Sequence, residues 1–129
     1  MSPSLRPFDC RSADGHVNVP SFGHDDGMPE LYGLHGRIVA TPGDGDDLVA
    51  LLLEGADGLA DMEGCRLYVI SRDPTDRDSV WITEVWSDRA AHDASLKDER
   101  VREVIRRARP LIASMPDSME LLPVGGKGL

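Results

Sequence analysis

The sequence predicts one α+β domain in which helices cover a single face of an antiparallel sheet. Three observations support this fold class. The chain has 129 residues, a usual length for a single domain. Its apolar spacing changes between that of strands and that of helices, in the order strand, helix, strand, strand, helix, strand. One of the strands carries bulky apolar residues on both sides, so both faces of the sheet need cover.

The first regular element is expected only after an irregular N-terminal arm. Residues 1–30 contain four prolines and three glycines and follow neither a strand nor a helix period. The segment Leu31 to Ala40 then ends in β-forming residues, and Thr41-Pro42-Gly43 forms a turn after it. We therefore predict an arm over 1–30, a domain over 31–124 that starts with this strand, and a tail over 125–129.

A helix is predicted from about Asp46 to Met62. Aspartates place negative charge at its start, where the helix dipole favours it, and apolar residues recur at helical spacing. Gly55 and Gly58 weaken the helix, each by roughly 1 kcal/mol relative to alanine. Gly64 is its expected stop.

A β-hairpin should follow the first helix. Its strands are expected at Arg66 to Ser71 and at Val80 to Trp86, with turn-forming residues between them over 73–78. Side chains alternate along a strand, so the second strand presents two different faces. One face carries Val80, Ile82, Glu84 and Trp86, and the other carries Trp81, Thr83 and Val85.

The last third of the chain predicts helical structure and a final strand. Ser87 is a good N-cap for a helix that starts directly after the hairpin. A second helical stretch, separate or continuous through a bend near Lys97, runs to Pro110, which interrupts it. The strand is expected at Ser118 to Val124, and Pro123 confines it to an edge of the sheet or to a terminus.

This order of elements is the split βαβ arrangement of the ferredoxin-like fold, βαββαβ with an antiparallel sheet. Its helices lie on one face, which leaves the second face to another partner. The strand from Val80 to Trp86 carries apolar side chains on both sides. The simplest way to bury the second face of the sheet is therefore a homodimer that packs sheet against sheet.

Charge and composition argue against several classes of partner. The 23 acidic and 14 basic residues give a net charge of -9, which repels nucleic acids and anionic membranes. No stretch is apolar enough to span a bilayer or to form a secretion signal, and Cys10 and Cys65 suggest two reduced thiols. We therefore expect a cytoplasmic protein. Possible metal ligands in the arm match no established spacing, so no metal site is expected; they are Cys10, His16, His24, Asp25 and Asp26.

Three segments carry a resemblance to a known family. The stretch Trp81 to His92 contains Glu-x-Trp, an acidic spacer and Ala-His, and Gly64 to Tyr68 supplies Gly-Cys-x-x-Tyr, although Glu63 stands where proline is common. Together with Arg37 to Gly43, these segments resemble the antibiotic biosynthesis monooxygenases, over residues 33 to about 123. The resemblance implies a dimeric α+β barrel, and oxidation of phenolic or quinol-like compounds by O2 without metal or flavin.

The resemblance and the residue chemistry together suggest His92 and Trp86 as catalytic residues. His92 can take up a proton near neutral pH, and the indole of Trp86 can stack on a flat aromatic substrate. A purely structural role is the alternative for both of them. Glu84 is a candidate for holding the substrate. It shares a strand face with Trp86, so it is either a buried carboxylate with a shifted pKa or a sign that this face is wet.

Four further residues are candidates for binding the substrate. For each of them, the alternative is a purely structural role in packing. The hydroxyls of Tyr32 and Tyr68 can donate to a substrate oxygen, and Arg37 or Arg66 can hold a phenolate. No nucleotide cofactor is expected, because carboxylates follow the first strand where a phosphate loop would lie.

Three functions are compatible with these residues. The first is a cofactor-independent monooxygenase that oxidises a small aromatic, phenolic or hydroquinone-like substrate. The second is a non-catalytic, small-molecule-binding or regulatory dimeric barrel. The third, haem degradation, is disfavoured because Gly36 stands where haem-degrading relatives carry an asparagine.

Overall fold

The computed structural model describes residues 30–129, and the expected arm lies outside them except for Glu30. The chain builds a sheet of four strands together with helices in the order that the periodicity predicts. The elements are β1 (Tyr32–Ala40), α4 (Gly45–Leu59), β2 (Cys65–Asp73), β3 (Asp76–Trp86), α5 (Arg89–Ser95), α6 (Glu99–Ala108), the 3-10 turn η2 (Arg109–Leu111) and β4 (Ile112–Leu121).

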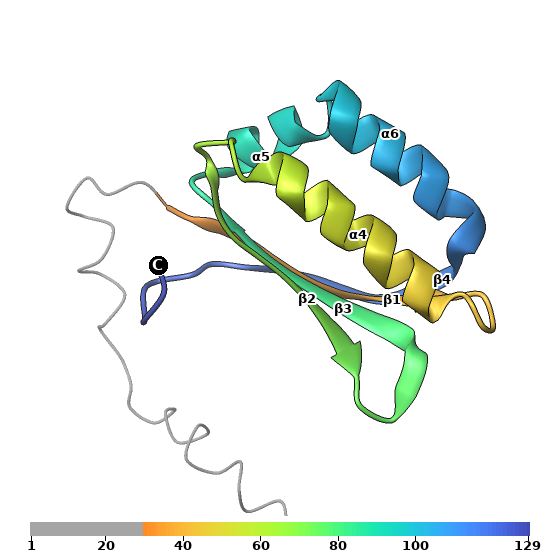
Figure 1. The fold of residues 1–129 in the computed structure, drawn as a ribbon. Helices are drawn as coiled ribbons and strands as arrows, with labels where there is room; N and C mark the ends of the chain where they lie inside the picture. The colour runs from red at the N-terminus through yellow and green to blue at the C-terminus, as the bar shows by residue number, and fades with distance from the viewer. Residues whose placement is uncertain (1–29) are drawn as a thin grey trace, which may run out of the picture. The chain divides into compact units, whose positions relative to one another are not determined.

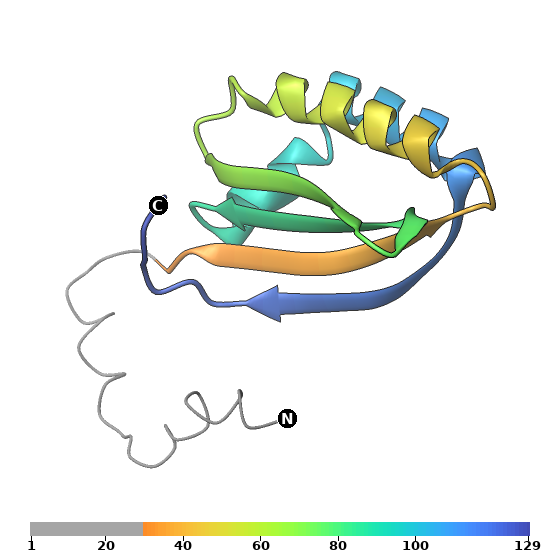
Figure 2. The same ribbon diagram turned by 60° about the horizontal axis from the view of Figure 1, so that its bottom comes forward.

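The strands form one open sheet in the order β2-β3-β1-β4, and every neighbouring pair is antiparallel. The helices cover only one face of this sheet, as Figures 1 and 2 show from two directions. The predicted α+β, ferredoxin-like class is therefore confirmed. We call the covered side the helix face and the opposite side the open face.

The hydrophobic core lies between the helix face and helices α4 and α6. Leu48 of α4 and Val80 of β3 have no exposed surface, and burying a side chain of this kind contributes about 1.5–3 kcal/mol. Further buried members come from β1, α4 and α6, namely Ile38, Ala40, Leu51 and Ala108. The alternating pattern of β1 and β3 thus directs one side of each strand into the core.

The prediction for the end of the first helix was wrong in detail. The helix α4 ends at Leu59 instead of Met62, and its C-cap Ala60 keeps a right-handed conformation. Gly64 does not stop the helix with a left-handed backbone. It is required for space instead, because a Cβ at this position would lie 2.5 Å from the Cβ of Ala91 in α5.

The prediction that Ser87 is an N-cap was also wrong by one residue, because the N-cap of α5 is Asp88. Asp88 adopts an extended backbone and its carboxylate accepts a hydrogen bond from the backbone N–H of Ala91, so α5 begins at Arg89. Asp98 caps α6 in the same way, accepting from the N–H groups of Arg100 and Val101. Two separate caps make α5 and α6 separate helices, which settles the alternative of one bent helix.

The predicted bounds of two strands were wrong. The strand β4 covers Ile112–Leu121 instead of 118–124, because its early part pairs with β1 despite its low apolar content. Pro116 is accommodated there because β4 is an edge strand and its register shifts between Asp117 and Ser114. The strand β3 begins at Asp76, so the hairpin turn is shorter than the turn-forming residues suggested.

No helix in the described part of the chain combines the length and the apolar character needed to cross a membrane.

Candidate active site

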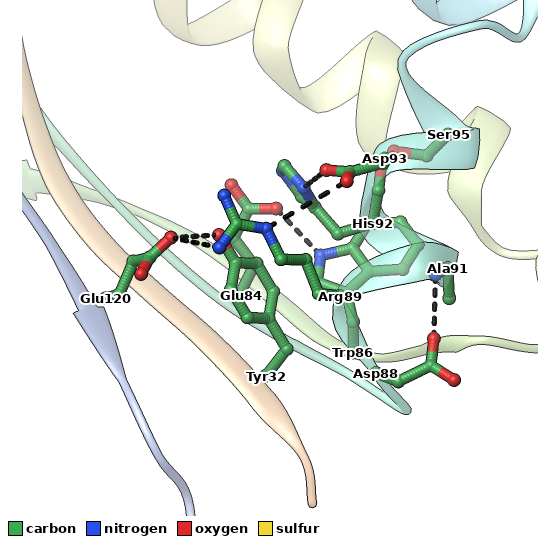
Figure 3. Close-up of polar contacts among 10 residues, drawn as sticks. All are labelled: Tyr32, Glu84, Trp86, Asp88, Arg89, Ala91, His92, Asp93, Ser95 and Glu120. Carbon is green, nitrogen blue, oxygen red and sulfur yellow. Dashed lines mark hydrogen bonds and ion pairs between the residues drawn. The ribbon is translucent and has the colours of Figure 1, made fainter.

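The candidate site lies on the helix face, where β3 ends and the chain turns into α5. Glu84 and Trp86 are two residues apart on β3 and therefore share this face. Trp86 is only 1% exposed, and its indole N–H donates a hydrogen bond of 2.8 Å to Oε1 of Glu84 (Figure 3). The buried indole thereby fixes the orientation of the carboxylate.

Two opposing effects act on the carboxylate of Glu84. Its burial raises the pKa, because removal from water disfavours the charged form. The hydrogen bond from Trp86 and the nearby imidazole of His92 lower the pKa, but the effect of burial is larger. The net result is a carboxyl group that binds a proton more strongly than a carboxyl group at the surface.

Tyr68 is the cross-strand neighbour of this carboxylate. It lies opposite Glu84 in the register of β2 and β3, so the two side chains leave the sheet on the same side. Burial, with a smaller contribution from Glu84, raises the pKa of the Tyr68 phenol far above its ordinary value. The phenol therefore stays neutral at physiological pH and can act as a hydrogen-bond donor.

His92 reaches the same region from α5. Its side chain is 14% exposed, and Nδ1 lies 3.1 Å from the carboxylate of Asp93. The imidazole meets the indole of Trp86 edge-on at 5.7 Å between ring centres and lies 5.2 Å from the ring of Tyr32. We call the group of Tyr32, Tyr68, Glu84, Trp86 and His92 the Trp86 cluster.

A second set of contacts ties α5 to the strands beside the cluster. The hydroxyl of Tyr32 donates to Glu120 of β4 at 2.8 Å, and Arg89 of α5 lies 3.4 Å from the same carboxylate. The guanidinium of Arg89 also lies 5.5 Å from the centre of the Tyr32 ring. Figure 3 shows Arg89, Tyr32 and Glu120 side by side. Arg89 and Glu120 were not predicted, since no sequence period brings α5 and β4 together.

The structure separates Arg37 from the other candidates. Arg37 lies on the open face, where it pairs with Asp117 at 2.8 Å and stands 5.7 Å from the centre of the Trp81 ring. His35 stacks on the same indole at 4.9 Å. The expected contact of Arg37 with a substrate oxygen is thus incompatible with a substrate bound at the Trp86 cluster. Arg66, the alternative, is exposed.

Among residues 30–129, no group of three or more His, Cys, Asp or Glu side chains is arranged to hold a metal ion. The metal-ligating residue types of the arm lie outside the described residues, and they are Cys10, His16, His24, Asp25 and Asp26.

The cluster combines three chemical properties on one sheet face. It offers a proton acceptor of raised pKa, a neutral phenol donor, and two aromatic rings in contact with an imidazole. Such a set can remove a proton from a weakly acidic hydroxyl, stabilise the resulting anion and exclude water from a flat ring.

Comparison with known proteins identifies the family to which the chain is similar. The sequence model described as antibiotic biosynthesis monooxygenase matches residues 31–107. A Chloroflexus aurantiacus protein, provisionally named an antibiotic biosynthesis monooxygenase, is 48% identical; the match covers 76% of this chain and 97% of that one, with a TM-score of 0.71. No functionally curated protein matches the chain.

More distant solved structures share the fold. A Pseudomonas aeruginosa protein is 22% identical, and the match covers 76% of this chain and 98% of that one with a TM-score of 0.69. A Bacteroides thetaiotaomicron protein, also provisionally named an antibiotic biosynthesis monooxygenase, is 14% identical; the match covers 75% of this chain and 92% of that one, with a TM-score of 0.69.

Proposed function

Because the chain belongs to the antibiotic biosynthesis monooxygenase family, we propose that it is a monooxygenase that uses O2 without a metal or an organic cofactor. The proposed substrate is a small aromatic compound of phenolic or hydroquinone-like type. The single observation that carries the proposal is the Trp86 cluster, in which acid-base groups and aromatic rings meet on one sheet face.

The proposed reaction converts a phenol with a free para position and O2 into a quinone and water. A base removes the phenolic proton, and the phenolate transfers an electron to O2. Recombination of the two radicals at the para carbon gives a peroxide, which becomes a hydroperoxide on protonation. Loss of the para proton and cleavage of the O–O bond then leave one oxygen atom in the quinone and release the other as water.

The residues of the cluster have distinct proposed roles. Trp86 limits access of water to the reacting ring, and Tyr68 donates a hydrogen bond to the phenolate oxygen. His92 and Glu84 are the candidate bases. Arg37 is not assigned to this oxygen, since it lies on the open face.

An oxygen electrode can test the proposal with anthrones and naphthohydroquinones as substrates. We expect consumption of O2 that depends on both enzyme and substrate. With an anthrone, whose para position is free, one atom of labelled O2 should appear in the product. His92→Ala should slow turnover by about 100-fold if His92 takes part in proton transfer, whereas the exposed control Lys97→Ala should not. Tight binding of these compounds without O2 consumption would instead indicate a binding or regulatory protein.

We also propose that the protein is a homodimer joined through its open faces. The open face carries the Trp81 indole, and exposed apolar side chains gather at Val69, Met119 and Leu121. An apolar surface of this kind is typical of an interface between subunits. The dimer would cover the second face of the sheet, as the apolar pattern of β3 requires.

A further inference from the structure

We propose that Glu84 is the catalytic base of this site, and that Tyr68 donates a hydrogen bond to the same substrate oxygen that Glu84 deprotonates. The inference rests on the proposed function and makes it more specific. It requires a substrate with a hydroxyl group on an aromatic ring, placed so that this oxygen lies between the carboxylate of Glu84 and the phenol of Tyr68.

The carboxylate of Glu84 is held through one of its two oxygens. Its Oε1 accepts the indole N–H of Trp86 at 2.8 Å, and Trp86 is itself buried. Within residues 30–129, no other side chain donates a hydrogen bond to Glu84. One oxygen thus fixes the group while the other keeps its full capacity to accept a proton.

Tyr68 is placed to share the substrate oxygen with Glu84. Directly opposite residues of an antiparallel pair have Cβ atoms about 4.5–5.5 Å apart, and Tyr68 faces Glu84 in this way. A neutral phenol and a carboxylate on the same face form a donor and an acceptor. A phenolic substrate can give its proton to the carboxylate and then receive a hydrogen bond from the phenol of Tyr68.

Proton affinity also favours Glu84 as the base. An efficient general base has a pKa close to the working pH, and an exposed carboxylate is too weak a base for this purpose. Burial moves the pKa of Glu84 upward, towards that range. The same burial keeps the phenol of Tyr68 neutral, so the two groups do not exchange roles.

The environment of His92 favours a supporting role for this residue. Its Nδ1 lies beside the carboxylate of Asp93, and its ring is in contact with both Trp86 and Tyr32. When protonated, it would lower the pKa of Glu84 through space. We therefore assign His92 as a positioning residue that adjusts the base.

The proton movements of the proposed reaction balance at Glu84. The carboxylate first takes the phenolic proton and then gives it to the peroxide anion, which forms the hydroperoxide. It next removes the proton from the para carbon while the O–O bond breaks, and passes that proton to the departing hydroxide as water. Glu84 thus ends the cycle ionised, as it began.

Anaerobic absorbance spectroscopy can test this step separately from oxidation. The probes are 4-nitrophenol and 2-naphthol, whose anions absorb at longer wavelength, mixed with the full-length protein in oxygen-free buffer below each probe's own pKa. We expect the wild type to bind a probe as its anion. Glu84→Gln should bind the neutral probe only, and Glu84→Asp should recover part of the anion signal.

Further variants distinguish Glu84 from its neighbours. Tyr68→Phe should weaken binding of the anion about ten-fold, as expected for loss of one hydrogen bond to a charged group. His92→Gln should keep the anion signal but move it to higher pH, and Lys97→Ala should leave it unchanged. Circular dichroism shows whether each variant is folded. If Glu84→Gln does not fold, Glu84→Asp takes its place in the comparison with the wild type.

The outcomes separate this inference from the proposed function. If the wild type ionises a probe, Glu84→Gln does not, and no substrate leads to O2 consumption, the monooxygenase proposal fails while Glu84 is still the group that takes up the phenolic proton. If O2 is consumed and Glu84→Gln turns over at the wild-type rate, the assignment of Glu84 is wrong although the function stands. A wild type that binds neither probe as an anion also overturns the assignment. In a positive result, Glu84→Gln lowers kcat/KM at least about 100-fold.

Discussion

The carboxylate of Glu84 is unusual among the acidic side chains of residues 30–129. Asp46, Asp73 and Asp98 accept hydrogen bonds at the surface, and these bonds lower their pKa values. Glu84 shifts in the opposite direction, because the effect of burial exceeds that of its single hydrogen bond. Glu84 thus contributes to stability with the opposite pH dependence to these surface aspartates.

Replacement of Glu84 by glutamine should stabilise the protein at neutral pH. Because the folded-state pKa of Glu84 is raised, its stabilising contribution is complete below the ordinary pKa of 4.5 and is lost as the pH rises through the folded-state value. Glutamine carries no charge and still accepts from the Trp86 N–H. Urea unfolding should therefore give Glu84→Gln a higher midpoint at pH 7, and the difference should shrink towards pH 4.

A lower stability of Glu84→Gln would contradict this prediction. If Glu84→Gln is less stable than the wild type at pH 7 and the difference does not depend on pH, then the charge of Glu84 is not disfavoured by burial. The surface variant Asp46→Asn is the matched control, and the sign of its pH dependence should be opposite, because the pKa of Asp46 is lowered.

Removal of the indole N–H should change the pH profile of the reaction. Trp86→Phe keeps an aromatic ring but removes the donor to Oε1 of Glu84. That hydrogen bond lowers the pKa of Glu84, so its loss should raise the pKa and move the acid limb of kcat/KM to higher pH. Steady-state kinetics across the pH range measure the shift. An unchanged acid limb would mean that the limb does not report Glu84.

The alternation of side chains along β3 made part of the candidate site predictable from the sequence. Glu84 and Trp86 share a face because they are two residues apart, and the same period assigns Trp81 to the opposite face. The contact of Arg89 with Glu120 depends instead on how α5 approaches β4 across the sheet. Arg37 alternates with the buried Ile38, but the pairing of strands was needed to show that its face is far from the cluster.

Among the elements, α4 begins in a way that no local pattern indicates. Asp44 forms no side-chain cap to the helix. Asp78 of β3 supplies the missing acceptor, and its carboxylate takes hydrogen bonds from the backbone N–H groups of Gly43 and Gly45 at 3.1 and 2.9 Å. The hairpin of β2 and β3 is therefore attached to the start of the helix that covers it.

Two glycine substitutions in α4 should have opposite effects. A Cβ at Gly45 would lie 2.1 Å from the carbonyl oxygen of Arg77, so Gly45→Ala must displace the backbone of the hairpin. We expect a loss of about 1–3 kcal/mol, as for an overpacked site. A Cβ at Gly58 meets no atom within 4 Å, and Gly58→Ala should stabilise the helix by about 0.5–1 kcal/mol.

Thermal unfolding measures both changes against the wild type. The paired design matters because helix propensity alone predicts stabilisation at both positions. Stabilisation by Gly45→Ala would show that α4 does not approach β3 as closely as the structure has it. Destabilisation by Gly58→Ala would show that this part of the helix packs against something further.

The elements themselves were predictable, but their ends were not. Apolar periodicity and capping residues located β1, β2, β3 and the helices α4, α5 and α6, because burial of one face stabilises each of them. The 3-10 turn η2 was not predicted. The start of β4 at Ile112 was missed, since an exposed edge strand holding Pro116 lacks an apolar pattern. Its pairing with β1 is a property of the backbone, which the side chains do not reveal.

At the scale of the whole molecule, the open face of the sheet still needs a packing partner. The stack of His35, Trp81 and Arg37 occupies the middle of this face, and Arg37 is further paired with Asp117. Exposed apolar side chains flank the stack on β2 and β4, namely Val69, Met119 and Leu121. A stable interface of standard size buries about 800 Å² on each partner, and the face of a four-stranded sheet can supply such an area.

A lysine on the open face should therefore separate the subunits. Val69 is 43% exposed, and in a two-fold symmetric dimer Val69→Lys introduces two charges into one interface. We expect the dissociation constant of the dimer to rise about ten-fold or more, because each charge must be desolvated without a partner. Leu53→Lys is the matched control, since Leu53 is 51% exposed on α4, on the other side of the molecule.

Sedimentation velocity over a range of concentrations should show dimers for the wild type and for Leu53→Lys, and monomers at low concentration for Val69→Lys. If Leu53→Lys dissociates and Val69→Lys does not, the subunits meet through their helices. If the wild type is a monomer throughout, the open face has another partner or none.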